Sequence, residues 1–487
     1  MATDKRARLS EIVGGSAVSE TSEAVSPGRQ DPAGIVFRPW LTVRPTETEQ
    51  VRQIVAWANE TRTPLVPLSS GGPHLHGGSA PSVPEAVQVD LRGMTKIARI
   101  DRRQRLALIE PGVTFEQLVP ALREHGLRIS LPLLPRRNKS VLASLLERAP
   151  TLVPRWHWNM TEPLRSLEVV WGNGDRLLTG SQTKTDRDED WESGVIPMVG
   201  GGPAQVDFFR MLSAAQGAMG IATWASVKIE PASDRQKLLV IPAATLPELI
   251  DCAYTLLKFR FGDETFIVNA AALARILGRG TAQRAGLAGT MPRWCLVVGI
   301  GGGSILGAEK VAAREADIRD IAQALGLQIT HELPGFPGPK LLDILQNPSP
   351  EPYWREGPTW ASRDIFFMAT LDRTPGFVAG MQQVSAAMAD PSDGIGSYIQ
   401  PVHMGAEVHC EFMLPFDPTN ATQSRRVGEL FEEGSRALFR QGAYYSRPYG
   451  MWSDMVFNAD AETTAATRKI KEIFDPNHVM NPGKLCF

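Results

Sequence analysis

The stretch from Ser69 to Gly78, "SSGGPHLHGG", follows an apolar run and is rich in residues that leave the backbone accessible or offer polar groups. Glycines remove side chains where a diphosphate would approach backbone N–H groups, and two serines add hydroxyl donors. These residues are Gly71, Gly72, Gly77, Gly78, Ser69 and Ser70. No G-K-[ST] follows, and no helix opens at once as in a Rossmann fingerprint. The stretch therefore predicts either a phosphate loop between two strands or a glycine-rich turn with exposed histidines.

A second chemical pattern is the segment "HMGAEVHCE", in which polar residues alternate with apolar ones. The period of two places one set of side chains on a single face of a strand. That set is His403, Gly405, Glu407, His409 and Glu411. Two imidazoles and two carboxylates on one face predict the floor of a pocket, and a solvated edge strand is the alternative.

A third pattern, "LVVGIGGGSILGAEKVAAREADI", has the order strand, glycine cluster and helix that a dinucleotide site needs. Its glycines read G-x-G-x-x-S, and no second strand ending in an acidic residue follows at the expected distance. We interpret this stretch as a plain turn between a strand and a helix.

Helices and strands must alternate to hold these motifs. Thr46 and Glu49 predict a capping box for a helix over 47–60, and Thr114 and Gln117 predict another, for a helix that stops at Gly126. Short β-branched runs lie between them and continue to about residue 230, which indicates an α/β or α+β unit.

The pattern changes near Pro231. A helix from Thr245, the strand-like "RWCLVVGI", a charged helix over 307–325 and a helix over 422–441 follow. We expect a second mixed unit over about 236–440.

Composition limits the function. The chain has 487 residues, 51 basic and 53 acidic side chains and a formal charge of -2, so a nucleic-acid surface is not expected. The 4 cysteines form no C-x-x-C pair, which excludes the usual iron–sulfur and zinc spacings. The first residues lack the apolar core of a signal peptide, and no run of about 18 apolar residues occurs. We expect a soluble cytoplasmic protein with no membrane span.

Five segments in order resemble the vanillyl-alcohol oxidase and p-cresol methylhydroxylase superfamily of flavoproteins. They are "PLSSGGPHLHGG", "VDLRGMTKIARIDRRQRLALIEPGVTFEQLVPALREHG", "LEVVWGNGDRLLTG", "QGAMGIATWASVKIEP" and "IFDPNHVMNPGKL". The resemblance covers most of residues 35–231 and about the last 45 residues, and it implies FAD as cofactor.

The resemblance implies an α+β fold of the PCMH type, in which residues 1–235 and 442–487 bind FAD and residues 236–441 form an inserted α/β cap. The glycine-rich stretch looks like the loop that receives the FAD pyrophosphate, and "GIAT" looks like the segment at the adenine end. The implied cofactor-binding residues are Pro67, Ser69, Ser70, Gly71, Gly72, Pro73, His74, Gly77, Gly78, Ser140, Val141, Gly220, Ile221, Thr223, Asn481 and Lys484. A surface turn ended by Pro482 is the alternative for the last two.

One departure concerns the attachment of the flavin. Some relatives fix it through a histidine directly after the second glycine of the loop, where this chain has Pro73. Non-covalent FAD is therefore favoured, with His74 and His403 as the residues that would overturn this expectation.

Two branches of the family act on different substrates and carry different motifs, which can be compared with this sequence. The 2-hydroxy-acid dehydrogenases carry a G-H-x-G-D-G-N-x-H metal motif that this chain does not reproduce, so we expect no metal. The phenol-oxidising branch carries Y-R-T-H-x-x-F-M-D, on which "SRPYGMWSD" places Arg447 at the arginine and Asp454 at the aspartate. This comparison favours the phenol branch.

The chemistry explains why these residue types matter. Hydride leaves a benzylic carbon readily when the ring oxygen is ionised, and tyrosine hydroxyls with an arginine stabilise that phenolate. Two other roles are open for Arg447. It would supply positive charge near flavin N1 and O2, or it would form an ordinary ion pair on the surface. The candidate catalytic residues are Arg447, Tyr445, Tyr444, His403, His409 and Glu407.

Three functions follow from the resemblance. The first is an FAD-dependent oxidoreductase of aromatic alcohols or para-alkylphenols, the second a dehydrogenase of 2-hydroxy acids, and the third a flavoprotein subunit that relays electrons. Its partners would be a small-molecule substrate and an electron acceptor, either a small molecule or a protein, and a homo-oligomer is compatible with the sequence.

Overall fold

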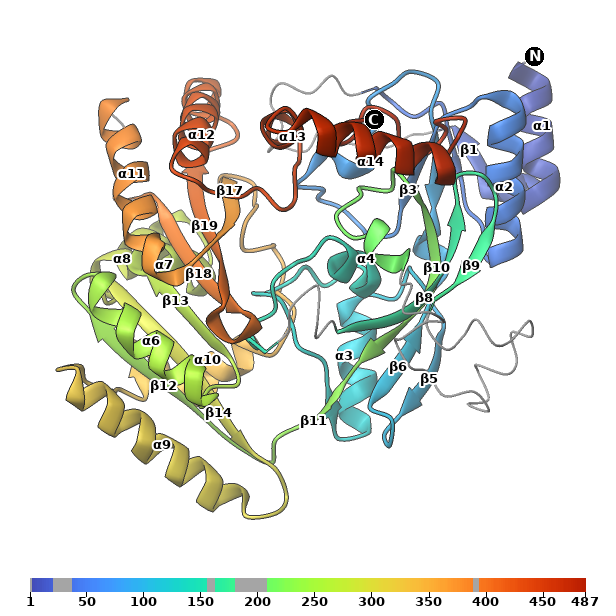
Figure 1. Ribbon diagram of the computed structural model, residues 1–487. Coiled ribbons are helices and arrows are strands. Elements are labelled where there is room, and N and C mark those ends of the chain that lie inside the picture. Colours follow the sequence, from blue (N-terminus) through green and yellow to red (C-terminus); the bar gives the residue numbers. More distant parts are fainter. Residues whose placement is uncertain (1, 21–36, 156–162, 180–207, 389–393) are drawn as a thin grey trace.

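The computed structural model describes residues 2–20, 37–155, 163–179, 208–388 and 394–487. Its strands form two sheets between residues 18 and 228 and a larger sheet between residues 235 and 416. We call these parts the two-sheet region and the six-stranded region. Figure 1 shows them on opposite sides of the molecule, and the mixed α+β class predicted from the sequence is confirmed.

The first sheet has the order β1-β2-β4-β3, in which β2, β4 and β3 run parallel. Its elements, with the two helices that share its core, are α1 (Ala2–Val13), β1 (Val18–Glu20), β2 (Leu41–Val43), α2 (Thr48–Thr61), β3 (Leu65–Leu68) and β4 (Val87–Asp90). Helix α2 begins one residue later than its predicted capping box. The N–H of Thr46 donates to Gln50 Oε1 over 2.8 Å instead of to Glu49, because Glu47 occupies the N-cap.

The second sheet is antiparallel, with the order β5-β6-β10-β8-β9. Its strands are β5 (Ile97–Asp101), β6 (Leu106–Ile109), β8 (Leu164–Trp171), β9 (Arg176–Leu178) and β10 (Gly220–Lys228). Helices α3 (Phe115–Glu124) and α4 (Val141–Leu146) pack against it, and β7 (Leu127–Arg128) pairs with β11 (Glu230–Pro231). The predicted capping box of Thr114 and Gln117 at the head of α3 is confirmed.

The third sheet has six strands in the order β12-β14-β13-β18-β19-β17, all antiparallel to their neighbours. They are β12 (Arg235–Ala243), β13 (Thr265–Asn269), β14 (Trp294–Gly302), β17 (Ala361–Ala369), β18 (Gly396–Val402) and β19 (Glu407–Phe416). Alternate residues of these strands enter two different cores, so helices cover both faces.

One face of this sheet packs against α6 (Pro247–Phe259), α9 (Gly307–Ala324), α11 (Thr374–Ala387) and α12 (Ala421–Arg440). The other face packs against α7 (Ala270–Leu277) and α10 (Gly338–Leu345), while α8 (Thr281–Thr290) lies beside α7 and a short hairpin, β15 (Glu332–Leu333) and β16 (Phe336–Pro337), precedes α10. The turn between β14 and α9, which resembled a dinucleotide site, packs on itself: a Cβ at Gly302 would collide with the backbone of Gly307.

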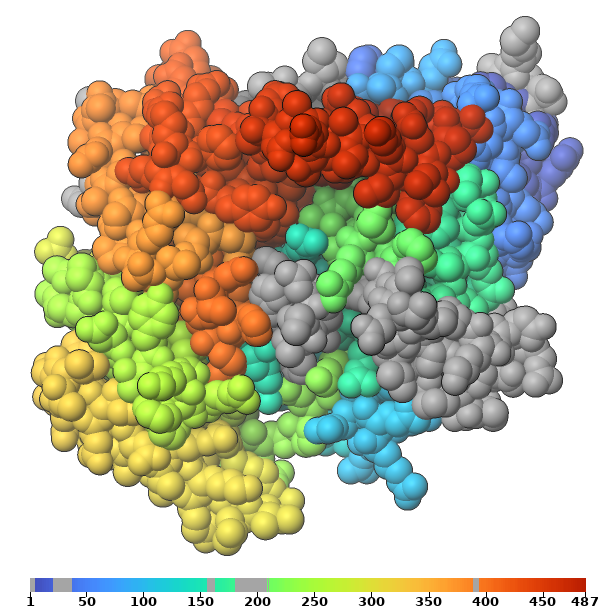
Figure 2. All heavy atoms as spheres, in the orientation of Figure 1, coloured from blue at the N-terminus to red at the C-terminus, as the bar shows by residue number. Residues whose placement is uncertain are grey.

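The C-terminal residues return to the two-sheet region through α13 (Met451–Phe457) and α14 (Ala461–Phe474). Figure 2 shows these residues as a red band that spans both regions. Beyond α14 the chain pairs with β3, where Leu65 donates to the carbonyl of Val479 over 2.7 Å and accepts from Asn481 N–H over 2.8 Å. The end of the chain therefore completes the edge of the first sheet.

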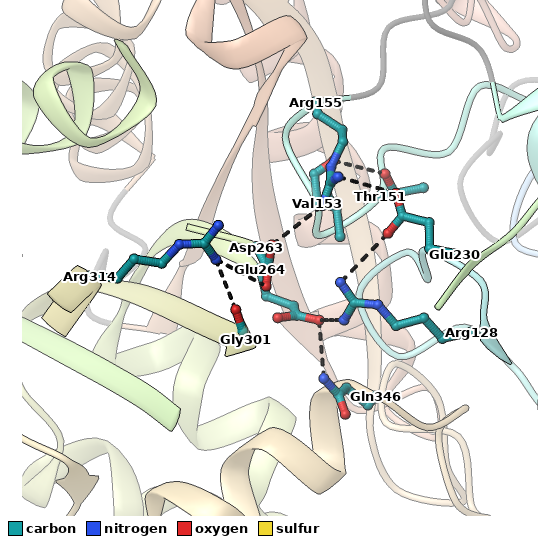
Figure 3. Close-up of polar contacts among 10 residues, drawn as sticks. All are labelled: Arg128, Thr151, Val153, Arg155, Glu230, Asp263, Glu264, Gly301, Arg314 and Gln346. Carbon is teal, nitrogen blue, oxygen red and sulfur yellow. Dashed lines mark hydrogen bonds and ion pairs between the residues drawn. The ribbon is translucent and has the colours of Figure 1, made fainter. Parts of the chain in front are cut away.

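A polar cluster joins the two regions (Figure 3). Arg128 of β7 lies 2.7 Å from Glu264, at the start of β13, and 3.7 Å from Glu230. Arg155 bridges Glu230 at 3.4 Å and Asp263 at 3.3 Å. Two arginines of the two-sheet region thus form ion pairs with two acidic residues of the six-stranded region, and these pairs link the two regions.

No helix in the described ranges is both long enough and apolar enough to cross a membrane.

Candidate active site

A cavity of about 300 Å³ lies where the two regions meet. The two-sheet region contributes the glycine-rich loop, the segment 132–150 and the start of β10. The six-stranded region and the segment after it contribute a mostly polar group of side chains, which are Tyr353, Arg355, Asp364, Phe366, Tyr398, His409, Glu411, Arg447 and Tyr449. The cavity thus joins the predicted phosphate loop to a polar pocket.

One side of the glycine-rich loop is tied to the segment 136–140. Gly71 N–H donates to the carbonyl of Asn138 over 3.0 Å, and the Asn138 amide donates to the carbonyl of Gly72 over 2.8 Å. Arg136 donates to the carbonyls of Gly71 and Pro73. Gly71, Gly72 and Pro73 therefore face this segment and do not line the cavity, unlike the sequence-based expectation.

The other side of the loop faces the cavity through Ser69, Ser70, His74, Leu75, His76 and Gly78. Among the described residues, none accepts a hydrogen bond from the backbone N–H groups of residues 74–78. Successive N–H groups without an acceptor form a concave site for an anion. The loop therefore fits the diphosphate of FAD, which is the group that the sequence resemblance implies.

We expect Gly78→Val to weaken FAD binding by about 10- to 100-fold, because overfilling a packed site costs about 1–3 kcal/mol. Gly78 lines the cavity, and a Cβ there would already contact Gln216 and Tyr449 at 3.6 and 3.7 Å. Flavin absorbance per mole of purified protein, followed by FAD titration of the apoprotein, measures the effect.

The matched control is Gly72→Val, because a Cβ at Gly72 would meet no described atom within 4 Å and the residue does not line the cavity. Equal FAD affinity in the two variants would contradict the assignment of residues 74–78 to the phosphates.

The C-terminal residues Asn481 and Lys484 brace the loop from behind. The Asn481 amide donates to the carbonyls of Gly78 and Gln216 over 2.7 and 2.6 Å, and Lys484 Nζ donates to the carbonyl of Gly77 over 2.8 Å. Neither side chain lines the cavity. Both support the loop from outside the cavity, whereas the sequence resemblance implied direct contacts with the flavin.

The remaining predicted cofactor residues fall into two groups, those that line the cavity and those that lie outside its lining. Pro67, Gly220 and Ile221 line the cavity. Ser140 caps α4 by accepting from Ala143 N–H over 3.0 Å. Ser140, Val141, Gly77 and Thr223 lie outside the lining, and the Thr223 hydroxyl donates to Glu168 over 2.6 Å. These four residues support the walls of the cavity.

At the polar end of the cavity, Arg447 lies 4.0 Å over the ring of Phe366 and its Nη2 donates to His409 Nδ1 over 3.2 Å. The other ring nitrogen of His409, Nε2, lies 3.0 Å from Glu411. Arg355 makes ion pairs with both Glu411 and Asp364. No carboxylate of the described residues forms an ion pair with Arg447, so its positive charge is left for a bound anion.

Burial and neighbouring charges set the protonation states of this end. Burial, aided by Arg447, lowers the pKa of His409 to about 4, so the imidazole is neutral near pH 7. Burial alone would raise the pKa of Glu411, but Arg355 and His409 outweigh it and hold that pKa well below the usual range. Glu411 is therefore a carboxylate.

Two tyrosines face the same space. Tyr449 stacks on His76 with 4.5 Å between ring centroids, and Tyr353 lies on the segment before β17. Burial raises the pKa of both phenols, so they are neutral donors. No other described residue is hydrogen-bonded to either hydroxyl, which leaves both for a ligand.

The predicted tyrosines lie elsewhere. Tyr445 stacks on Trp452 at 4.7 Å, and its hydroxyl donates to the carbonyl of Ser435 over 2.8 Å, so it belongs to the core beneath α12. Tyr444 is 58% exposed. A buried tyrosine needs only one carbonyl partner, which sequence does not reveal.

The predicted continuous strand over 403–411 is also corrected. His403 begins a short 3-10 turn that ends at Gly405, with Met404 at φ 56°, and β19 starts only at Glu407. Neither His403 nor Glu407 lines the cavity, whereas His409 and Glu411 do. In the described part of the chain, no group of three His, Cys, Asp or Glu side chains is arranged to hold a metal ion.

The sequence did not identify Tyr353, Arg355, Asp364 or Phe366 as site residues. The period of two along β17 places Asp364 and Phe366 on one face and was a usable signal. Lys139 and Glu147 were also not predicted as site residues, and they form a 2.5 Å ion pair in the cavity wall. No pattern marked the loop that carries Tyr353 and Arg355.

The sequence matches two families, described as FAD binding domain over residues 39–180 and as FAD linked oxidases, C-terminal domain, over residues 368–485. It is 33% identical over 143 residues to the 4-cresol dehydrogenase [hydroxylating] flavoprotein subunit of Pseudomonas putida. These matched residues make up 29% of this chain and 27% of that protein. It is 26% identical over 215 residues to glycolate oxidase subunit GlcD of Bacillus subtilis, 44% of this chain and 41% of that protein. The chain thus spans less than half the length of these curated relatives.

Solved structures share the fold over nearly the whole chain. p-Cresol methylhydroxylase with substrate bound has a TM-score of 0.82 at 21% identity and covers 100% of this chain and 97% of its own. 4-Ethylphenol oxidase from Gulosibacter chungangensis has a TM-score of 0.81 at 18% identity, covering 99% and 96%. The two matched families together cover more than half of the chain, in the order that the fold requires. The chain therefore carries the FAD binding domain and the C-terminal domain of the FAD linked oxidases, and it shares the fold of p-cresol methylhydroxylase.

Proposed function

We propose that this protein is an FAD-dependent oxidoreductase that removes hydride from the benzylic carbon of a phenolic substrate, such as an aromatic alcohol or a para-alkylphenol. The observation that carries the proposal is Arg447, a cation that is 8% exposed, lines the cavity and has no carboxylate partner among the described residues. Such a group is costly to bury unless an anion binds beside it.

The residues around Arg447 suit a phenolate. The Tyr353 and Tyr449 hydroxyls are neutral donors without partners in the described chain, and with Arg447 they are three hydrogen-bond donors that line the same cavity. Donors fixed in place before the charge develops lower the barrier of its formation. Bound FAD supplies a hydride acceptor at flavin N5. The aromatic walls formed by Phe366 and His76 keep water from the substrate ring.

Residues 1–235 with 442–487 form the FAD-binding domain in this proposal, and residues 236–441 form the cap. Residues 74–78 hold the phosphates, and Gly220 and Ile221 lie toward the adenine end. The cap contributes the polar end of the cavity.

We expect the FAD to be non-covalent. His403 lies outside the cavity, and His74, which lines it, follows by one residue the position of the attaching histidine, where this chain has Pro73. Acid precipitation should release all flavin into the supernatant, measured by absorbance. Yellow colour in the pellet would contradict the expectation, and a His74→Ala variant would then identify the attachment residue.

Anaerobic mixing with a panel of substrates tests the function. A para-alkylphenol or a 4-hydroxybenzyl alcohol should bleach the flavin absorbance, while the matching compounds without the ring hydroxyl should not. Equal bleaching with and without that hydroxyl would refute the role of a phenolate.

A 2-hydroxy acid is the alternative substrate. Glycolate oxidase subunit GlcD and a D-lactate dehydrogenase of Archaeoglobus fulgidus match 44% of this chain each, and Arg447 would suit a carboxylate. Bleaching by glycolate or D-lactate in the same panel would select this alternative.

An electron-relay subunit is the other alternative, because one relative is described as a flavoprotein subunit. Steady turnover of the purified chain with an artificial electron acceptor supports an enzyme. Flavin reduction only after a partner protein is added supports a relay.

A further inference from the structure

The polar end of the cavity contains five side chains in an unbroken row of hydrogen bonds and ion pairs, namely Asp364, Arg355, Glu411, His409 and Arg447. We propose that this row positions Arg447 toward the substrate, and that His409 does so as a fixed neutral tautomer with its proton on Nε2. The proposal rests on the proposed function only in that a phenolate is the anion that Arg447 meets.

The contacts determine the tautomer. An arginine has donors only, so the His409 Nδ1 that lies 3.2 Å from Arg447 Nη2 must accept. The proton of the neutral ring is then on Nε2, which lies 3.0 Å from the carboxylate of Glu411. Both ring nitrogens are used, and reversing the tautomer would place two donors face to face at Nδ1 and two acceptors face to face at Nε2.

The far end of the row is anchored to the sheet. Glu411 lies on β19 and Asp364 on the neighbouring β17, and Arg355 bridges their carboxylates. The Arg355 guanidinium also stacks over the ring of Trp354 at 4.1 Å. Side chains held by adjacent strands keep their geometry better than side chains on loops.

Arg447 needs such an anchor because it lies on the connection between α12 and α13, outside any helix or strand. Packing over the ring of Phe366 at 4.0 Å leaves the planar guanidinium free to rotate over that ring. The hydrogen bond to His409 selects one orientation, so the remaining N–H groups point consistently into the cavity.

The row also explains why His409 is neutral. Burial disfavours a charged imidazole, and a proton on His409 would add a cation directly beside Arg447. A general base must take up a proton during the reaction, whereas a positioning residue must not. The two roles therefore predict different outcomes for a substitution that cannot be protonated.

Two substitutions separate these roles. His409→Leu removes the acceptor and should weaken the binding of phenol by about 10- to 100-fold, as expected for one lost hydrogen bond to a charged group. Its FAD content should be unchanged, since His409 contacts no residue of the glycine-rich loop through a hydrogen bond within the described chain. His409→Gln should restore most of the affinity, because an amide accepts from Arg447 and donates to Glu411.

Phenol is the probe because it has no benzylic carbon and is not turned over. Its binding is measured by the change in flavin absorbance, and benzyl alcohol, which lacks the ring hydroxyl, is the control whose weak binding should not respond to either substitution. With a para-alkylphenol as substrate, flavin reduction in His409→Gln should be at least about tenfold faster than in His409→Leu, because the amide restores the hydrogen bond to Arg447. A reduction rate as low as in His409→Leu would overturn the proposal in favour of a base.

The tautomer has a test that does not depend on the substrate. Nitrogen-15 NMR of histidine-labelled protein, assigned with His409→Gln, should show Nε2 protonated and Nδ1 unprotonated from pH 6 to 8. A proton on Nδ1 would overturn the proposal. If phenol does not bind the parent protein, the proposed substrate class fails, and this measurement alone decides the role of His409.

Discussion

Arg447→Ala should bind FAD normally and slow the reduction of the flavin by substrate by about 10² to 10³, the loss typical of removing one preorganised electrostatic group. Arg447 is a buried cation without a carboxylate partner in the described chain, so removal leaves no other described charge unpaired. Arg447→Lys should recover little of the rate, because an ammonium cannot donate to His409 and to a phenolate in the plane of a guanidinium. Stopped-flow absorbance under anaerobic conditions measures the reduction.

Arg440→Ala is the matched control. That guanidinium is 64% exposed and pairs only with Glu433 at 3.2 Å among the interactions described, so its removal should leave the rate unchanged. An Arg447→Ala enzyme reduced within about twofold of the parent would remove the phenolate assignment, whereas the FAD site would stand.

The second large effect is expected at Lys471. Its side chain is 1% exposed and pairs with Asp475, and it also donates to the carbonyls of Ala218 and Met480. Asp475 in turn accepts from the N–H groups of Val479 and Met480 over 3.0 and 2.9 Å. Breaking a buried pair leaves an uncompensated charge, so Lys471→Met should lower the free energy of unfolding by about 3–5 kcal/mol.

The same substitution should release FAD at lower temperature, because the turn at Asp475 leads to the residues that brace the glycine-rich loop. Thermal unfolding followed by flavin fluorescence measures both changes. Lys469→Met, at an exposed position of the same helix, is the control. Equal melting temperatures in the two variants would show that the buried pair does not hold the tail.

Sequence reasoning identified what is encoded locally. The capping box at Thr114, the turn between β14 and α9, and the ordered motifs of the FAD domain depend on neighbouring residues and were predicted correctly. Arg447 was placed in the candidate site by its motif, and it lines the cavity.

The incorrect predictions concern residues whose positions depend on contacts with distant segments of the chain. Tyr445 and Tyr449 have the same residue type a few positions apart, and only the packing of α12 sends one into the core and leaves the other in the cavity. Arg355 meets Glu411 across more than 50 residues of sequence, through an ion pair that no local pattern marks. Gly71 and Gly72 have the composition of a phosphate loop, but contacts with Asn138 turn them away from the cavity.

The pairing of β3 with the C-terminal residues has a consequence for biosynthesis. The backbone of Leu65 forms hydrogen bonds with Val479 and Asn481. The edge of the first sheet therefore stays incomplete until more than 400 further residues have been translated. Residues 77 and 78 gain their braces from Asn481 and Lys484 at the same late moment. Contacts of such long sequence separation form late in folding. Tight capture of FAD must therefore follow the synthesis of residues 479–484, and nascent chains stalled before residue 475 should not retain the cofactor.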